Sequence, residues 1–186
     1  MSLLDKKLKE FKLAREIVDV YRDRVSEESL TGVIQGISDE FLYMSLITEE
    51  GEKNGISIFH IDDVTRVSMG GNTRAAIKAL GAHAQTRLAS PTIDLSSLEA
   101  VIESVQNTFG YVNLIAEFLE DNISFIGEVA EQDSEWLLLR YYGTMSTLEK
   151  AGMLLDKAEI SRIDAGSKYE ESISYLATHG VGKKTP

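Results

Sequence analysis

The stretch GVIQGISDEFLYMSL, residues 32–46, decides the fold, because its pattern returns in GEVAEQDSEWLLL, residues 127–139. Both stretches place a glycine in an apolar run, followed by an acidic turn, an aromatic residue and a second apolar run. The two copies are 95 or 96 positions apart at four pairs of residues: Gly32 and Gly127, Phe41 and Trp136, Arg66 and Arg162, Gly70 and Gly166. A duplicated pattern of this length is typical of two copies of one small domain.

The composition limits the classes to which the protein can belong. Its 186 residues, 43% apolar and 26% charged, are ordinary for a soluble globular protein. Cysteine is absent, which excludes disulfides and thiolate metal sites. The net charge of −11 at pH 7 disfavours nucleic acid and anionic membranes as partners, since phosphate attracts basic surfaces. Without a long apolar run or an apolar leader, we expect a cytoplasmic protein that has no membrane partner.

A helix is expected to open each copy. Residues 3–15 contain no glycine or proline and place apolar residues on one face. In the second copy, Asp94 is the expected N-cap of a helix that runs to Phe109 and stops at Gly110.

Five short strands are expected after each opening helix. Residues 16–38 and 111–133 each predict two strands around a polar turn, which the second copy places at Asp121-Asn122. FLYMSLI and WLLLRYYG follow as nearly continuous apolar runs, typical of a bent strand that is covered on both faces. Two further strands and a trailing helix complete each copy, the helices lying in residues 72–89 and 167–180.

The boundary between the copies is expected beside Pro91, one of only two prolines in the chain. We predict a first domain over residues 1–89, a second domain over residues 92–180 and a flexible tail over residues 181–186. The tail has no apolar face to bury.

The order of these elements resembles the Sm-like fold, in which a helix precedes five strongly bent antiparallel strands. The residues that resemble the first Sm motif are Gly32, Asp39 and Phe41 in the first copy and Gly127, Asp133 and Trp136 in the second. IFHIDDVTRV and LLDKAEISRI resemble the region of the fourth and fifth strands, where the second motif lies. The resemblance implies an α+β protein with two tandem five-stranded bent antiparallel barrels, each preceded and followed by a helix.

The resemblance also implies a candidate binding site at the motif positions. Family members that bind RNA use a polar residue, commonly Asn, in the first motif and an Arg or Lys in the second. Here Tyr43 stands near the Asn position, and the loop carries Asp62 and Asp63, which cannot attract phosphate. The candidate binding residues are Asp39, Phe41, Tyr43, Asp62, Asp63, Asp133 and Trp136.

Each candidate also has a structural interpretation. Gly32 and Gly127 are expected to permit a bend in their strands. Asp39 and Asp133 are expected to accept backbone N–H bonds in tight turns. The aromatic residues lack interleaved cations and are expected to pack in the core or at a subunit contact. The three histidines show no metal-ligating spacing and no GxSxG motif occurs, so we predict no cofactor, no metal and no enzyme activity.

Sm-like proteins assemble by pairing edge strands of neighbouring subunits, and free strand edges are general sites of recognition. We therefore predict a non-enzymatic binding or scaffolding module that assembles through barrel edge strands and contacts protein partners or further copies of itself. The alternative, implied by the resemblance, is an RNA-binding protein of the Sm-like class. The sequence leaves open whether the trailing helices cap the edges.

Overall fold

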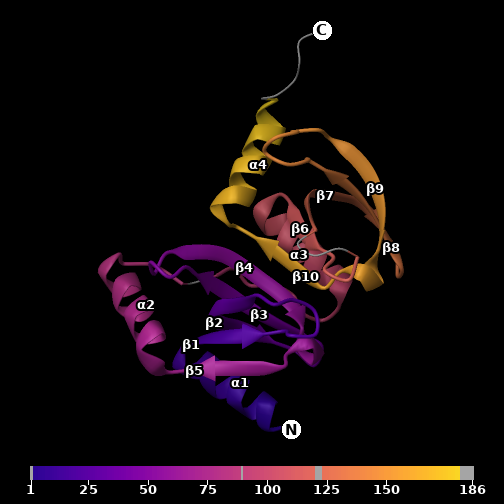
Figure 1. The fold of residues 1–186 in the computed structure, drawn as a ribbon. Coiled ribbons are helices and arrows are strands. Elements are labelled where there is room, and N and C mark those ends of the chain that lie inside the picture. The colour runs from indigo at the N-terminus through magenta and orange to yellow at the C-terminus, as the bar shows by residue number, and fades with distance from the viewer. Residues whose placement is uncertain (1, 89, 120–122, 181–186) are drawn as a thin grey trace. The chain divides into compact units, whose positions relative to one another are not determined.

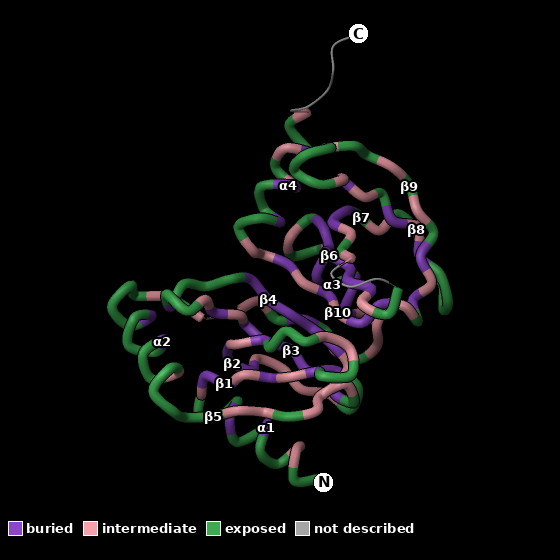
Figure 2. The backbone as a smooth tube through the Cα atoms, in the orientation of Figure 1, coloured by how far each residue is buried: buried purple, intermediate pink, exposed green. Residues whose placement is uncertain are grey.

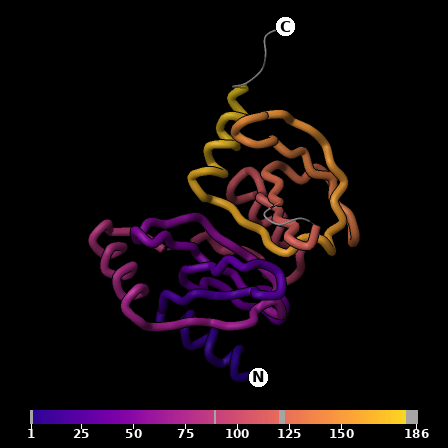
Figure 3. The backbone as a smooth tube through the Cα atoms, viewed as in Figure 1, coloured from indigo at the N-terminus to yellow at the C-terminus, as the bar shows by residue number. Residues whose placement is uncertain are grey.

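A computed structural model describes residues 2–88, 90–119 and 123–180 of the chain (Figure 1). The chain divides into two compact units, Met1–Ser96 and Ser97–Pro186, which are called the first half and the second half below. Figure 3 follows the path of the backbone through each of them. The predicted turn at Asp121-Asn122, the predicted tail at 181–186 and Ala89 lie outside the described residues.

Both halves have the same order of elements. The first half contains α1 (Leu3–Ala14), β1 (Ile17–Tyr21), β2 (Ser29–Ile37), β3 (Phe41–Ile47), β4 (Lys53–His60), the 3-10 helix η1 (Ile61–Asp63), β5 (Arg66–Met69) and α2 (Gly71–His83). The second half contains α3 (Leu98–Phe109), β6 (Val112–Ile115), β7 (Ser124–Gln132), β8 (Trp136–Tyr141), β9 (Ala151–Asp156), the 3-10 helix η2 (Lys157–Glu159), β10 (Arg162–Ala165) and α4 (Lys168–His179).

The α+β class is correct, but the prediction of two tandem five-stranded barrels is wrong. The strands of each half form an open antiparallel sheet, ordered β5-β1-β2-β3-β4 in the first half and β10-β6-β7-β8-β9 in the second. A closed barrel requires its two end strands to pair with each other. The four residues of β5 instead pair with Val18–Tyr21 of β1, while β4 pairs with β3. The five strands of the first half therefore do not close on themselves.

Side-chain caps fix the ends of the helices. Ser2 begins α1 with a capping box, and Ser167 begins α4 in the same way. The expected cap at Asp94 is wrong, because Ser97 caps α3 and Asp94 instead accepts a hydrogen bond from the Ser96 N–H. Gly110 ends α3 with a φ of 79°, as predicted, since a left-handed residue suits glycine.

Close contact between strands explains why glycine occupies positions 32 and 127. A Cβ atom at Gly32 would lie 2.1 Å from the Ser45 carbonyl oxygen, and one at Gly127 would lie 2.3 Å from the Arg140 carbonyl oxygen. The irregularities of the ladders occur elsewhere, at Ile34/Gly36 between β2 and β3 and at the equivalent step between β7 and β8. The two glycines thus serve close approach of backbones, and the bulge lies a few residues later.

The core of the first half lies between α1 and the sheet (Figure 2). Its buried members are Leu8, Phe11, Val18, Val20, Leu30, Ile34, Leu42, Met44, Phe59 and Ile61. In the second half the same role falls to buried residues of α3, β6, β7, β8, β9 and β10, among them Val101, Val105, Leu114, Ile126, Leu137, Leu139, Leu155 and Ile163. Burial of this apolar area is the main favourable term that holds each half together.

Candidate functional site

The turn before β3 forms differently from the prediction. Ser38, and not Asp39, accepts backbone hydrogen bonds: its Oγ lies 3.0 Å from the Phe41 N–H. Asp39 is exposed. In the second half, Asp133 does what was predicted, because its Oδ1 accepts hydrogen bonds from the N–H groups of Glu135 (2.8 Å) and Trp136 (2.7 Å). These bonds lower the pKa of the Asp133 carboxyl below its ordinary value.

Ser38 and Asp133 are therefore the equivalent residues of the two halves, each three positions before the aromatic residue of its turn. The sequence contains this signal, since 38 and 133 are 95 apart, like Phe41 and Trp136. Asp39 and Asp133, by contrast, are 94 positions apart, so aligning these two acids requires an extra residue in the first copy. An Asp and a Ser side chain can both accept the same backbone bonds, so the turn needs no acid.

The aromatic candidates of the first half are buried. Phe41 is 2% exposed, and its ring centroid lies 4.8 Å from that of His60. Tyr43 is 3% exposed and donates its hydroxyl to the Pro91 carbonyl oxygen at 2.9 Å. Burial raises the pKa of the Tyr43 hydroxyl to about 12. These two side chains build the interior and present no surface to a ligand.

The acidic candidates of η1 lie beside the β2–β3 turn. The Ile61 N–H donates to the Glu40 carbonyl oxygen at 2.8 Å, which brings the two segments together. Asp62 is exposed and Asp63 is half-buried. The structure thus collects carboxylates at this end of the first half, an arrangement that repels phosphate.

The matching place in the second half holds a buried lysine that the sequence reasoning missed. The Lys157 N–H donates to the Glu135 carbonyl oxygen at 2.9 Å, as Ile61 does to Glu40. The Lys157 side chain is 4% exposed, and its Nζ lies 2.6 Å from Glu99 Oε1 and also donates to the Asp133 carbonyl oxygen. This ion pair lowers the pKa of Glu99.

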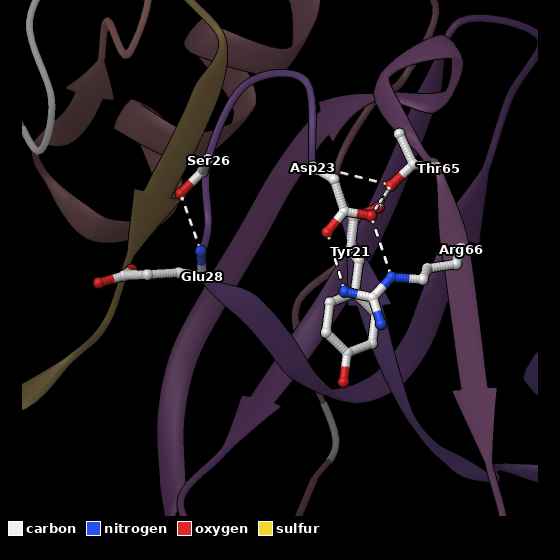
Figure 4. A network of polar contacts seen from close by, with 6 residues as sticks. All are labelled: Tyr21, Asp23, Ser26, Glu28, Thr65 and Arg66. Atoms are coloured by element: carbon white, nitrogen blue, oxygen red, sulfur yellow. Dashed lines mark hydrogen bonds and ion pairs between the residues drawn. The ribbon is translucent and has the colours of Figure 1, made fainter.

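An acid, a hydroxyl and an arginine form a network where β1 approaches β5 (Figure 4). The Asp23 carboxylate accepts hydrogen bonds from Arg66 Nε (3.0 Å), Arg66 Nη2 (2.9 Å) and Thr65 Oγ1 (2.5 Å). The Arg66 guanidinium also lies 3.7 Å from the centroid of the Tyr21 ring. Arg66 and then Thr65 hold the pKa of Asp23 at about 2.

The second half contains the same three kinds of side chain in a buried form. Ser161 Oγ donates to Glu117 Oε2 at 2.6 Å, and Arg162 lies 3.6 Å from Glu117 and 3.2 Å from Asp164. Ser161 is 1% exposed. A hydroxyl that is buried and bonded to a carboxylate cannot meet a substrate, so this network stabilises the fold.

One surface differs strongly between the halves: the face of the sheet turned away from the helical core, called the outer face here. In the first half, segment 86–95 covers it. Gln35 Nε2 donates to the Leu88 carbonyl oxygen at 2.8 Å. Tyr43 donates to Pro91, and Leu95 lies so close to Gly36 that a Cβ there would be 2.8 Å from Leu95 Cδ1.

The outer face of the second half is open at β8 and β9, whereas β6 is buried and its Asn113 donates to Glu170 of α4. FLYMSLI is buried on both faces, as predicted, but WLLLRYYG is not. Trp136 is 45% exposed, Leu154 is 67% exposed and Leu138 between them is half-buried. Figure 2 shows β3 and β4 mostly buried, whereas β9 is mostly half-buried or exposed. We call Glu131, Trp136, Leu138, Leu154 and Asp156 the open patch.

A surface cavity of about 380 Å³ lies at the start of α2, lined among others by Gly70, Gly71, Arg74 and Lys78. Arg74 is already engaged there, since it forms an ion pair with Asp19 and donates to the Gly70 carbonyl oxygen at 2.6 Å. Gly70 is the N-cap residue of α2, and Gly71 begins the helix. The cavity therefore lies at the N-terminal end of α2, and the charge of its Arg74 is already neutralised by Asp19.

Within residues 2–88, 90–119 and 123–180, no group of three or more His, Asp or Glu side chains is placed to hold a metal ion. None of the helices in those ranges has the length and apolar character needed to span a membrane. Comparison with known proteins finds no match: no family model, no curated protein and no solved structure matches the chain.

Proposed function

We propose that the chain is a non-enzymatic binding or scaffolding module that recruits protein partners through the end strands of its sheet. The observation that carries the proposal is that, among the described strands, β9 pairs with another strand on one side only. This strand pairs with β8 on one side and is the last strand of the order. In the described part of the chain no strand pairs with its other side, so its outward backbone groups can bond to another chain.

The side chains of β9 support this use. The strand has the sequence AGMLLD and contains no lysine or proline, the residues that commonly block an edge. Its Leu154 is one of the most exposed large apolar side chains of the second half. In the first half the end strand β5 carries Met69, which is 48% exposed. Assembly through end strands is also what the resemblance to Sm-like proteins implies.

The charges favour a protein partner over RNA. The cations beside the motif positions already have carboxylate partners: Arg66 with Asp23, Lys157 with Glu99, and Arg162 with Glu117. Cations that are neutralised in this way release few counterions from a nucleic acid, and affinity for RNA depends on that release. Ser161 is 1% exposed, so its hydroxyl is not accessible as a nucleophile, in line with a non-enzymatic role.

Site-specific photo-crosslinking tests the proposal. A photoreactive phenylalanine derivative is placed at Leu154 on β9 or at Met69 on β5, and in a control at Leu13, which is 88% exposed on α1. Irradiation in the producing cells should yield defined adducts from the strand positions and none from position 13. Adducts identified as the protein itself would indicate self-assembly, which light scattering of the purified chain checks independently.

The same yield from all three positions would contradict the proposal. RNA that co-purifies, and that binds in a filter assay with an affinity falling as salt rises, would replace it by the RNA-binding alternative.

A further inference from the structure

The open patch differs from its first-half equivalent at three neighbouring positions. In the first half Gly36 pairs with Tyr43, and Tyr43 pairs with Ile58. In the second half Glu131 pairs with Leu138, and Leu138 pairs with Leu154. Residues that pair directly across a ladder share a face. The row Gly-Tyr-Ile of one half therefore becomes Glu-Leu-Leu in the other.

The first half shows what kind of segment covers this row. Residues 86–88 and 90–95 form neither helix nor strand, and they contact the outer face at Gln35, Tyr43 and Gly36. Their Pro91 carbonyl oxygen accepts the Tyr43 hydroxyl, and the Leu95 side chain fills the space that Gly36 leaves. With this cover, Tyr43 is 3% and Ile58 is 1% exposed.

From this comparison we infer that the open patch binds an extended segment of a partner protein, with apolar side chains over Leu138 and Leu154 and a lysine or arginine facing Glu131. The inference rests on the proposed function and names the chemistry of the partner. The partner needs an apolar residue over Leu138. Tyr43, at the equivalent position, donates its hydroxyl to a backbone carbonyl, whereas Leu138 has no hydrogen-bond donor in its side chain. A cation is needed where Leu95 lies in the first half, because Glu131 replaces the glycine there.

The surrounding charge selects the same partner. Asp156 pairs with Trp136 in the ladder, and Asp133 and Glu135 lie in the turn before it. These carboxylates attract a basic segment and disfavour a second copy of a chain whose net charge is −11. Trp136 and Leu154 provide the apolar area that such a segment would remove from water.

Two matched peptides test the inference. The basic probe is TRLASPTIDK, the sequence of residues 86–95 with its last leucine replaced by lysine, acetylated and amidated. The acidic probe ends in glutamate instead. Trp136 is the only tryptophan of the chain, so a shift of its emission to shorter wavelength reports cover of the patch itself. Anisotropy of the labelled peptide gives the affinity.

The basic probe should bind about fivefold more tightly than the acidic probe, as expected for one exposed ion pair gained against one repulsion. Glu131→Lys should reverse that preference. Leu154→Arg should abolish binding, while Leu13→Arg, at an exposed site on α1, should leave it unchanged. Leu154 is exposed, so the variant is expected to fold, and thermal unfolding checks this.

Equal affinity for both probes, or binding that survives Leu154→Arg, would overturn the inference. Binding seen only after residues 181–186 are removed would identify the chain's own tail as the occupant and also overturn it. A dimer that dissociates in the Leu154→Arg variant would also overturn the inference, because the occupant of the patch would then be a second copy of the chain. Failure of the probes with successful crosslinking at position 154 would leave the proposed function standing without this partner; failure of the crosslinking would remove the function itself.

Discussion

The two halves use one order of elements and reach opposite results on the outer face of the sheet. In the first half a segment after α2 covers Tyr43, whose hydroxyl donates to the Pro91 carbonyl oxygen, and the neighbouring Ile58 is 1% exposed. The second half leaves the equivalent Leu138 and Leu154 half-buried and exposed. The backbone plan therefore does not decide whether this face belongs to the interior or to the surface. Segments outside the strands decide it, and the same plan can serve as a closed core in one place and a docking surface in another.

A second difference lies where the helix before each first strand meets the 3-10 helix. Leu4 and Ile61 belong to one apolar cluster in the first half. Glu99 and Lys157, at the corresponding places, form an ion pair with a nitrogen to oxygen distance of 2.6 Å. A position that must be filled can thus be filled by apolar packing or by a paired charge, provided that every polar atom finds a partner.

What the halves share is equally instructive. Asp23, Thr65 and Arg66 correspond to Glu117, Ser161 and Arg162, although Asp23 and Arg66 are exposed, whereas Ser161 is buried and Glu117 and Arg162 are half-buried. In both halves the hydroxyl residue donates its N–H to the end of the first strand, to Tyr21 or Ile115, at 2.9 Å. Where the first strand meets the fifth strand, both halves therefore place an acid, a hydroxyl residue and an arginine together, whether or not these side chains are exposed.

The largest expected effect tests whether both halves depend on the same close approach of strands. Gly32→Ala and Gly127→Ala should each lower the free energy of unfolding of their own half by about 4 kcal/mol, because the added Cβ meets a backbone carbonyl. Gly152→Ala is the control, since its Cβ would meet nothing nearer than 4.0 Å. Urea denaturation measures the change, with Trp136 emission reporting the second half. A large loss at one glycine alone would break the equivalence.

The next test compares the covered and the open face directly. Ile58→Thr should lower the free energy of unfolding by about 3 kcal/mol, since it removes buried apolar area and buries a hydroxyl. Leu154→Thr should change it by less than about 0.5 kcal/mol, because that side chain is 67% exposed. Thermal and urea unfolding of both variants give the values. Equal losses would mean that the open patch is covered in solution.

Much of the local structure was predictable because it depends on neighbouring residues. The stop at Gly110 and the helix after Ser2 follow from capping and periodicity within a few positions. The sequence could not predict that the sheet stays open. Closure into a barrel depends on the length of β5, which has only four residues, and on its pairing with strands that are distant in the sequence. A pattern of five strands is the same whether the ends meet or not.

The candidate site shows the same limit. The sequence located the turns that hold Asp39 and Asp133, but exposure of WLLLRYYG could not be inferred from its apolar run. Both runs are mainly apolar, and the difference in exposure depends on residues of segment 86–95, far from either run in the chain. The pairing of Lys157 with Glu99 was missed for a similar reason, because 58 positions separate them.

A smaller effect is expected from exchanging the ion pair for the apolar pair of the first half. Glu99→Leu alone should destabilise by about 2 kcal/mol, since it leaves the buried Lys157 without its carboxylate. The double variant Glu99→Leu, Lys157→Ile, which copies Leu4 and Ile61, should recover that loss. A double-mutant cycle by urea denaturation measures the coupling. A double variant as unstable as the sum of its single variants would show that the two halves are not interchangeable here.

The smallest expected effect concerns the exposed acid network of the first half. The pKa of Asp23 is about 2 in the folded chain against an ordinary 3.8, so its ion pair contributes stability above about pH 4 that is lost as the pH falls toward 2. Arg66→Gln should raise the titration midpoint of Asp23 toward 3.8, and Thr65→Val should raise it less, because Arg66 is the larger cause. Carboxyl carbon NMR follows the titration. Asp133 is the control in the other half: backbone N–H groups lower its pKa, so neither substitution should move it. An Asp23 midpoint that stays near 2 without Arg66 would assign the shift to Thr65 and the backbone, and would make the network of the first half a hydrogen-bonded turn like that of Asp133.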